Sequence, residues 1–244
     1  MIAQVRAELL KIRSTRTTVG LVLGMVALAL LFGLLAGLLT KAGHLGAKEE
    51  QRSLLTDGSV AGIFAALAGV LLVTSEFRFG TIRPTFLFTP RRWRVIAAKV
   101  VASMLAGLVF GVIAEAIALV VGYVTLDARG IPFVLDAHDL VRFVPGTVAG
   151  VVLWGGIGVG VGAVVRNQVG AVIGLLAWGF IVENLLFAFV PSIGRFTPGE
   201  AQNALMGLTT RHLLAQAAGG GVLVAWTVAV AALAVAATAR RDVS

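Results

Sequence analysis

The sequence predicts an all-α, polytopic membrane protein with six transmembrane helices. Hydrophobic residues make up 58% of the 244 residues and charged residues only 13%, far from the composition of a soluble domain. Six apolar runs reach or approach the length of about 20 residues that a helix needs to cross the hydrocarbon. We expect a single transmembrane domain over residues 1–244, with spans at about 18–39, 58–75, 96–124, 143–165, 168–190 and 218–238.

The distribution of Lys and Arg predicts the orientation of these spans. Six spans place both termini on the same side as segment 76–99, and 13 of the 20 basic residues fall on that side. Short loops rich in Lys and Arg stay in the cytoplasm, so we expect both termini to be cytoplasmic. The same rule accounts for the formal net charge of +8, and we therefore expect no nucleic-acid partner.

Residues 1–16 predict an amphipathic helix that lies on the inner leaflet. Apolar residues recur at steps of three and four from Ile2 to Ile12, and the basic residues lie largely on other faces. A secretory signal peptide is the rival interpretation, but the apolar run from Thr18 to Leu39 is longer than a signal-peptide core. The residues expected to anchor this helix to the membrane surface are Arg6, Lys11, Arg13 and Arg16.

Segment 76–99, EFRFGTIRPTFLFTPRRWRVIAAK, is the most basic stretch of the chain. Its mixture of basic and aromatic residues predicts contact with a membrane surface and a protein partner. Thr81 is placed to cap a short helix over Ile82–Phe88, and Thr89 with Pro90 predicts the start of the third span. We expect the short helix to lie across the cytoplasmic mouth of spans two and three.

Glu76 lies at the expected cytoplasmic end of the second span. It either pairs with Arg78 or Arg91 at the membrane surface, or relays motion from a partner protein. Arg91, Arg92 and Arg94 are expected to bind anionic lipid at about 1 kcal/mol each, with contact to a protein partner as the alternative.

Three polar residues fall inside the predicted spans. Glu115 lies near the middle of the third span, and Glu183 and Asn184 lie in the fifth. Ionisable groups at membrane depth face the bundle interior or a cavity. Three roles are open for them: a structural hydrogen bond between helices, the lining of an export path, or a proton relay.

The later connections differ in length and polarity. The sequence from Arg166 to Gln168 supplies the only polar residues between spans four and five, which predicts a tight antiparallel hairpin. Segment 191–217 is too polar for a seventh span, and we expect one or two short helices on the outer face. This segment either gates the exit or shields the protein from solvent.

Glycines recur at a spacing of four in several spans. A nucleotide-binding turn would need a preceding strand, so close helix packing explains the spacing better. The pairs are Gly107 with Gly111, Gly158 with Gly162, and Gly170 with Gly174.

Several motifs resemble those of ABC exporter permeases of the type 2 class, a family of bacterial drug, antibiotic and lipid exporters. The string E-F-R-x-G-T-I begins at Glu76, a Pro-Arg-Arg step begins at Pro90, and Lys99 follows eight residues after Arg91. The strings AELLKIRSTRTT, GVGVGAVVRNQVGA and PSIGRFTPGEAQNAL are similar to actinobacterial members, so the likeness covers essentially the whole chain.

This resemblance implies a permease of the bacterial plasma membrane that moves hydrophobic or amphiphilic compounds. It implies a dimer, a homodimer rather than a heterodimer, that binds two copies of a separate cytoplasmic ATPase. No G-x-x-x-x-G-K-[ST] motif occurs, so ATP and Mg are expected on the partner, with no cofactor, metal or catalytic residue on this chain. The residues that the resemblance assigns to ATPase coupling are Glu76, Arg78, Gly80, Thr81, Ile82, Arg83, Phe86, Pro90 and Arg91.

A proton-coupled secondary transporter is the alternative, with Glu115 and Glu183 as proton carriers. An intramembrane enzyme is not supported, because the sequence has no H-E-x-x-H motif and only the fragment TDGSVA of an aspartate-rich metal motif. A channel is not supported either, because no filter-like sequence stands out.

Overall fold

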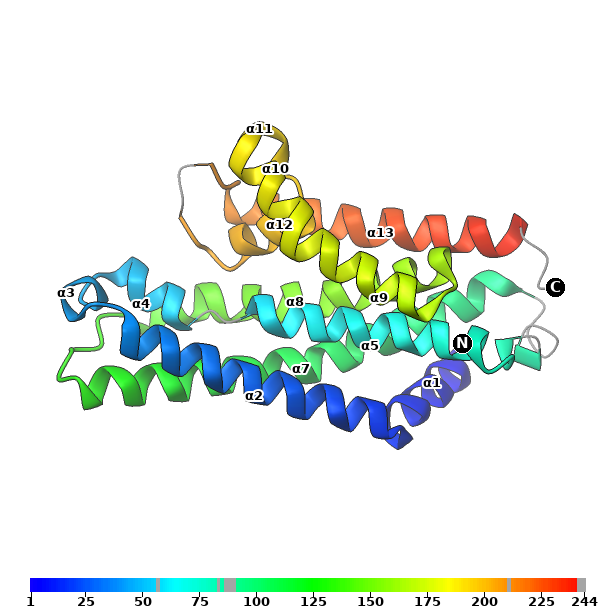
Figure 1. Ribbon diagram of the computed structural model, residues 1–244, viewed down its shortest axis with the longest axis horizontal. Coiled ribbons are helices and arrows are strands. Elements are labelled where there is room, and N and C mark those ends of the chain that lie inside the picture. Colours follow the sequence, from blue (N-terminus) through cyan, green and yellow to red (C-terminus); the bar gives the residue numbers. More distant parts are fainter. Residues whose placement is uncertain (56–57, 83, 86–90, 210–211, 241–244) are drawn as a thin grey trace.

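The computed structural model describes residues 1–55, 58–82, 84–85, 91–209 and 212–240, and every regular element in these residues is helical (Figure 1). Six helices in this part of the chain are long and apolar enough to cross a membrane, which confirms the predicted all-α chain with six spans. They are α2 (Arg16–Leu39), α5 (Gly58–Arg78), α7 (Arg92–Ala128), α8 (Ala137–Val165), the interrupted helix from Gln168 to Phe189, and α13 (Gln216–Arg240).

Within the described residues, five short helices accompany the spans. α1 precedes the first span, two helices lie between α2 and α5, and two lie between the fifth span and α13. The pair between α2 and α5 was not predicted. The bounds are α1 (Ile2–Ser14), α3 (Ala42–Leu45), α4 (Lys48–Leu55), α11 (Pro191–Gly194) and α12 (Pro198–Leu205).

Two spans are longer than predicted because charged residues continue the helix beyond the apolar run. α7 has 37 residues, about 55 Å at 1.5 Å per residue, which exceeds the hydrocarbon thickness of about 30 Å. It begins at Arg92, whereas Thr89 and Pro90 were predicted to start it; those two residues lie outside the described part. α8 begins at Ala137, where Asp136 and Asp139 form a reciprocal capping box.

The fifth span is not a continuous α-helix. α9 (Gln168–Ala177) is followed by the π-helix η1 (Trp178–Val182) and by α10 (Glu183–Phe189). The Asn184 side-chain amide donates to the carbonyls of Gly179 and Phe180, at 3.2 and 3.1 Å, and thereby satisfies backbone groups of the π segment. No sequence pattern predicts this interruption, because a π turn leaves the apolar character of the span unchanged.

The predicted tight hairpin between spans four and five is confirmed. α8 ends at Val165, and its C-cap residue Arg166 adopts a left-handed backbone conformation with φ 58°. Asn167 then caps α9, since its Oδ1 accepts from the Gly170 N–H at 2.8 Å. Two residues therefore suffice to reverse the chain.

The centre of the bundle is built around the glycine-rich α8. A side chain at Gly158 would overlap the backbone of Ala66 on α5, and a Cβ at Gly155 would stand 2.6 Å from the Ser103 carbonyl oxygen on α7. The predicted close packing therefore holds for α8, and Ser103 Oγ adds a hydrogen bond of 2.9 Å to the Gly155 carbonyl. It does not hold for Gly174 on α9, which has no neighbour within 4 Å.

The helices run along one long axis, and the two ends of the bundle differ (Figure 1). The N-terminus, α1, the end of α5, the start of α7 and the end of α13 lie at one end, which we call the basic end. α3, α4 and the start of α8 lie at the other, which we call the α4 end. α1 and the end of α13 therefore lie at the same end of the bundle, as an even number of spans requires.

Replacing Gly158 by alanine tests the central contact. We expect Gly158→Ala to lower the unfolding temperature of the detergent-solubilised protein by several degrees, because forcing helices apart in a packed core costs about 1–3 kcal/mol. The measurement is thermal unfolding followed by intrinsic fluorescence.

The matched control is Gly174→Ala, at a position with open space around it. Alanine is favoured over glycine in a helix by about 1 kcal/mol, so this variant should keep or raise the unfolding temperature. Equal effects of the two substitutions would contradict the role given to the α5–α8 contact.

Candidate functional site

Four charged side chains meet at the basic end and join three helices. They are Glu8 and Lys11 of α1, Glu76 of α5 and Lys99 of α7, here called the four-charge cluster. Lys99 Nζ lies 2.9 Å from Glu8 Oε2 and 2.8 Å from Glu76 Oε1. Lys11 Nζ lies 3.0 Å from Glu8 Oε1 and 2.6 Å from Glu76 Oε1. The cluster therefore ties the N-terminal helix to two spans.

The cluster is largely closed to solvent, which makes its internal pairing essential. Lys99 is fully buried and its ammonium group also donates to the Leu72 carbonyl at 3.4 Å, so all three of its hydrogens have acceptors. Two carboxylates balance two ammonium groups. Removing one partner of such a buried group leaves an uncompensated charge, at a cost of about 3–5 kcal/mol.

Lys11 is the partly exposed member of the cluster. Burial alone would lower the pKa of Lys11, but its hydrogen bonds to Glu76 and Glu8 outweigh burial and raise the pKa above its ordinary value of 10.5. Lys11 therefore remains charged at neutral pH. Glu76 Oε2, by contrast, is buried without a hydrogen-bond partner among the described residues.

The predicted pairing of Glu76 with Arg78 or Arg91 is wrong. Glu76 points inward to Lys11 and Lys99, and it is only 5% exposed. Lys11 was expected to anchor α1 to the membrane surface; it is exposed, and its ammonium group donates to Glu8 and Glu76. The other three expected anchors of this helix, Arg6, Arg13 and Arg16, are exposed.

Two arginines at the basic end bind the last turn of α13. Arg92 donates to the Thr238 carbonyl at 2.8 Å, and Arg166 donates to the Ala237 carbonyl at 2.9 Å. Carbonyl groups at a helix C-terminus lack intrahelical donors, and a cation there also suits the helix dipole. Arg92 was expected to bind lipid, and the structure gives its guanidinium this protein contact.

The surface of the basic end next to the cluster is aromatic and cationic. Phe79 is 71% exposed with the Arg78 guanidinium 5.4 Å from its ring centroid, and Trp93 is 49% exposed with Arg94 at 5.5 Å. Large exposed aromatic side chains beside arginines are typical of protein-contact surfaces. Arg91 is exposed on the same end.

The remaining coupling candidates are only partly described. Gly80, with φ +69°, and Thr81 are exposed at the end of α5, whereas Ile82 is buried against Val95. Thr85 donates from its N–H and its hydroxyl to the Thr81 carbonyl, which makes one helical turn. Arg83, Phe86 and Pro90 lie outside the described residues, and so does most of the expected helix over Ile82–Phe88.

The three polar residues predicted inside the spans have separate environments. Glu183 is buried, and its carboxylate accepts from Trp178 Nε1 at 2.6 Å and from the Gly199 N–H at 2.8 Å. It therefore ties the fifth span to the first turn of α12. Asn184 lies on the exposed face and bonds to its own π segment, as described above, while Glu115 is buried within α7.

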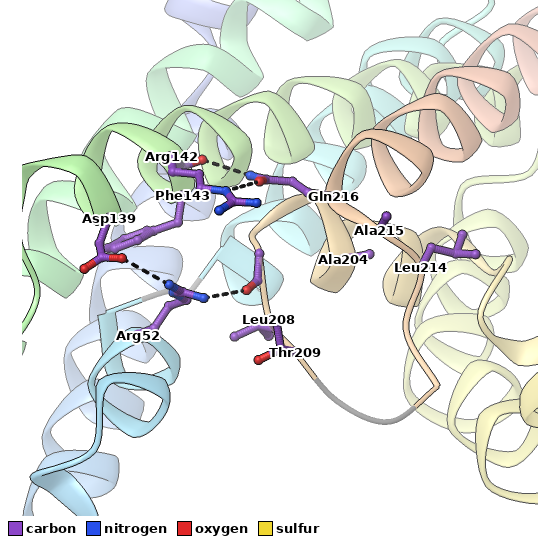
Figure 2. A pocket seen from close by; sticks show the side chains of 11 residues that line it. Arg52, Asp139, Arg142, Phe143, Ala204, Leu208, Thr209, Leu214, Ala215 and Gln216 are labelled. Atoms are coloured by element: carbon purple, nitrogen blue, oxygen red, sulfur yellow. Dashed lines mark hydrogen bonds and ion pairs between the residues drawn. The ribbon is translucent and has the colours of Figure 1, made fainter.

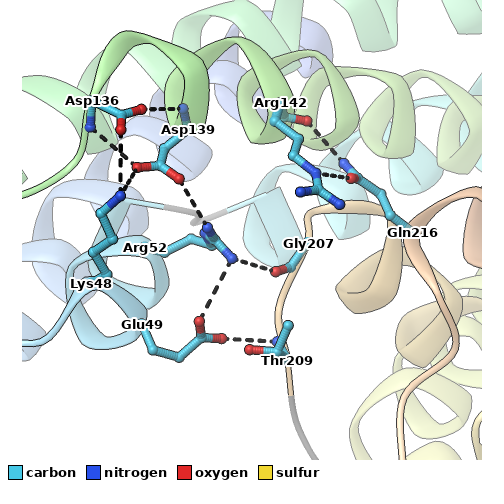
Figure 3. A network of polar contacts seen from close by, with 9 residues as sticks. All are labelled: Lys48, Glu49, Arg52, Asp136, Asp139, Arg142, Gly207, Thr209 and Gln216. Atoms are coloured by element: carbon cyan, nitrogen blue, oxygen red, sulfur yellow. Dashed lines mark hydrogen bonds and ion pairs between the residues drawn. The ribbon is translucent and has the colours of Figure 1, made fainter.

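A second polar network closes the α4 end (Figure 3). Lys48 Nζ lies 2.7 Å from Asp139 Oδ2, and Arg52 reaches Asp139 Oδ1 at 3.4 Å and donates to the Gly207 carbonyl at 3.0 Å. Glu49 accepts from the Thr209 N–H at 2.8 Å. α4, the start of α8 and the connection after α12 are thus held together by charge-assisted bonds.

A cavity of about 230 Å³ opens beside this network (Figure 2). Its polar walls include Arg52, Asp139, Arg142 and Gln216, and Gln216 donates to the carbonyls of Arg142 and Leu205, each at 2.9 Å. Its apolar walls come from Phe143, Ala204, Leu208, Leu214 and Ala215.

The acidic residues at the start of α8 are not suited to a metal ion. The ligand atoms of Asp136, His138 and Asp139 lie within 4.8 Å of one another. Both carboxylates are already engaged, however, in the capping box and with Lys48, and Asp139 also with Arg52. A metal ion would have to displace these cations.

Sequence reasoning missed Glu8 and did not assign a role to Lys99. Both carried a signal. Glu8 is the only acidic residue before Glu49, in a segment rich in Arg and Lys. Lys99 and Glu115 are the only charges between Val95 and Leu126, and a lysine in an apolar helix requires a partner.

Comparison of the sequence with protein-family models gives no match, and comparison with curated proteins gives none either.

Proposed function

We propose that this chain is the membrane-spanning permease subunit of an ATP-driven exporter of the type 2 ABC class. The observation that carries the proposal is the four-charge cluster, which joins α1 to α5 and α7. The E-F-R-x-G-T-I string begins in the last turn of α5 and runs into the connection between α5 and α7. A push on that connection would therefore reach both spans and α1 together.

The exposed surface beside the cluster supports a docked protein. Phe79 and Trp93 stand out from the basic end, each with an arginine beside its ring. The positive-inside rule favours a cytoplasmic location for this end, where an ATPase is available, and the resemblance implies a bacterial plasma membrane. Two ATPase subunits, carrying ATP and Mg, would dock on a permease dimer, and this chain would contribute no catalytic group.

The cargo proposed is hydrophobic or amphiphilic. The spans are made largely of Ala, Leu, Val and Gly, so binding in the bundle would come mainly from buried apolar area. Glu183 is engaged with Trp178 and Gly199, which favours a structural role over a proton relay at this position. A proton-coupled secondary transporter is the alternative that the experiment below separates.

Replacing Phe79 by alanine tests the docking surface. The chain would be coexpressed with candidate ATPase subunits from its own genome, purified as a complex, and assayed for ATP hydrolysis in lipid. We expect Phe79→Ala to weaken complex assembly or hydrolysis by about tenfold or more, because truncating a central interface aromatic costs about 2 kcal/mol.

Phe189→Ala is the matched control, since Phe189 is 79% exposed and ends the fifth span, away from the segment that docks. It should leave assembly and hydrolysis unchanged. If no ATPase is recruited and the chain alone transports cargo along a proton gradient, the proposal is wrong and the secondary transporter is favoured.

Substitutions in the four-charge cluster test whether it transmits motion from the α5–α7 connection to the spans. Lys99→Met alone should lower the unfolding temperature strongly, because it leaves two buried carboxylates with one ammonium group. The double variant Glu76→Gln with Lys99→Met retains the Glu8–Lys11 pair and should be the more stable of the two. We expect the double variant to assemble with the ATPase and hydrolyse ATP while exporting several-fold less cargo.

Export per ATP hydrolysed, measured in proteoliposomes, separates transmission from stability. If the double variant is well folded and exports a normal amount of cargo per ATP, the four-charge cluster is not needed to couple ATP hydrolysis to export. Arg13→Gln, which changes an exposed charge on the same helix α1, serves as the control and should export normally.

A further inference from the structure

The lining of the cavity at the α4 end carries more positive than negative charge. Its lining contains the guanidinium groups of Arg52 and Arg142 and only one carboxylate, that of Asp139. Arg52 and Asp139 bind each other at 3.4 Å, and Lys48 further neutralises Asp139 at 2.7 Å. Glu49, nearby, is engaged with Arg52 and with the Thr209 N–H. The positive charge of Arg142 is therefore not balanced within the lining.

Arg142 also has hydrogen-bonding capacity to spare. Its Nε donates to Gln216 Oε1 at 3.2 Å, which fixes the plane of the guanidinium (Figure 2). Its two terminal amino groups bind no acceptor among the described residues, and neither does the hydroxyl of Thr209. A guanidinium held by one bond, with its terminal amino groups open, is suited to the two oxygens of a carboxylate or phosphate.

The rest of the cavity is apolar and small. Phe143, Leu208 and Leu214 contribute apolar side chains to its lining. About 230 Å³ is below the volume of about 300–1,000 Å³ of pockets that enclose whole drug-sized ligands. The cavity lies where α8 and α13 begin, so a chain that leaves it can continue along the apolar surfaces of these spans.

We propose that this cavity binds the acidic head of an anionic amphiphile, a carboxylate or phosphate on an alkyl chain. The head accepts from the terminal amino groups of Arg142 and from the Thr209 hydroxyl. The first methylene groups lie against Leu208, Leu214 and Phe143, and the remaining chain stays in the membrane. This inference does not rest on the proposed transport function, because binding can be measured without an ATPase.

The test is competition binding to the purified full chain in a nonionic detergent. Radiolabelled laurate is the probe, and the competitors are dodecyl phosphate, dodecanol and inorganic phosphate. We expect dodecyl phosphate to compete, dodecanol and inorganic phosphate to compete at least about tenfold less well, and Arg142→Gln to weaken laurate binding about tenfold or more. The control Arg13→Gln removes an exposed arginine of α1 and should bind laurate normally.

Arg142→Gln also removes the hydrogen bond from Arg142 to Gln216, so a second variant that keeps this contact is needed. Leu214→Asp leaves Arg142 in place and adds a negative charge to the apolar wall, so it should also abolish laurate binding while the unfolding temperature stays near that of the wild type. Unchanged laurate affinity in either variant overturns the proposal. If dodecanol competes as strongly as dodecyl phosphate, the acidic head is not what the cavity recognises. If inorganic phosphate competes as strongly as dodecyl phosphate, the alkyl chain does not contribute to binding.

Discussion

A charge placed away from water must find an opposite charge, and the buried ammonium of Lys99 imposes this constraint on the whole basic end. Satisfying it requires Glu76 from α5 and Glu8 from α1, so the N-terminal helix is tied to two spans. Thr15, between α1 and α2, takes an extended conformation that separates the two helix axes. α1 is therefore joined to the bundle through its buried residue Glu8, with most of its other side chains exposed or half-buried.

The apolar runs were sufficient to predict the six spans, and the reason is physical. A helix in hydrocarbon satisfies its own backbone, so length and hydropathy decide where a span lies. The end of α7 and the start of α8 were missed because Asp127 and Asp139 extend helices beyond the hydrocarbon, where charge no longer signals a loop. Hydropathy also carries no trace of the π turn at Trp178–Val182.

The charge pairs could not be predicted in the same way. Glu76 has arginines beside it in the sequence, yet its partners are 65 and 23 residues away. Which cation it meets depends on how α1 and α7 cross α5, and local sequence does not encode that crossing. At the α4 end the same limit applies, because Arg52 and Asp139 are 87 residues apart in the sequence. Between the two ends, glycine contacts at α8 leave little room for helices to slide. The bundle therefore has a tightly packed middle, and a network of charged side chains joins its helices at each end.

The origin of Glu8 in the first helix has a consequence for how the protein is made. Glu8 is synthesised 91 residues before Lys99, so a carboxylate must be held near the membrane surface until the third span arrives. α1 thus carries a counter-ion, Glu8, that is synthesised before the lysine it pairs with. A fusion or label that draws the N-terminus away during synthesis would leave Lys99 to enter the bilayer with only Glu76 beside it, and tags for expression are better placed after α13.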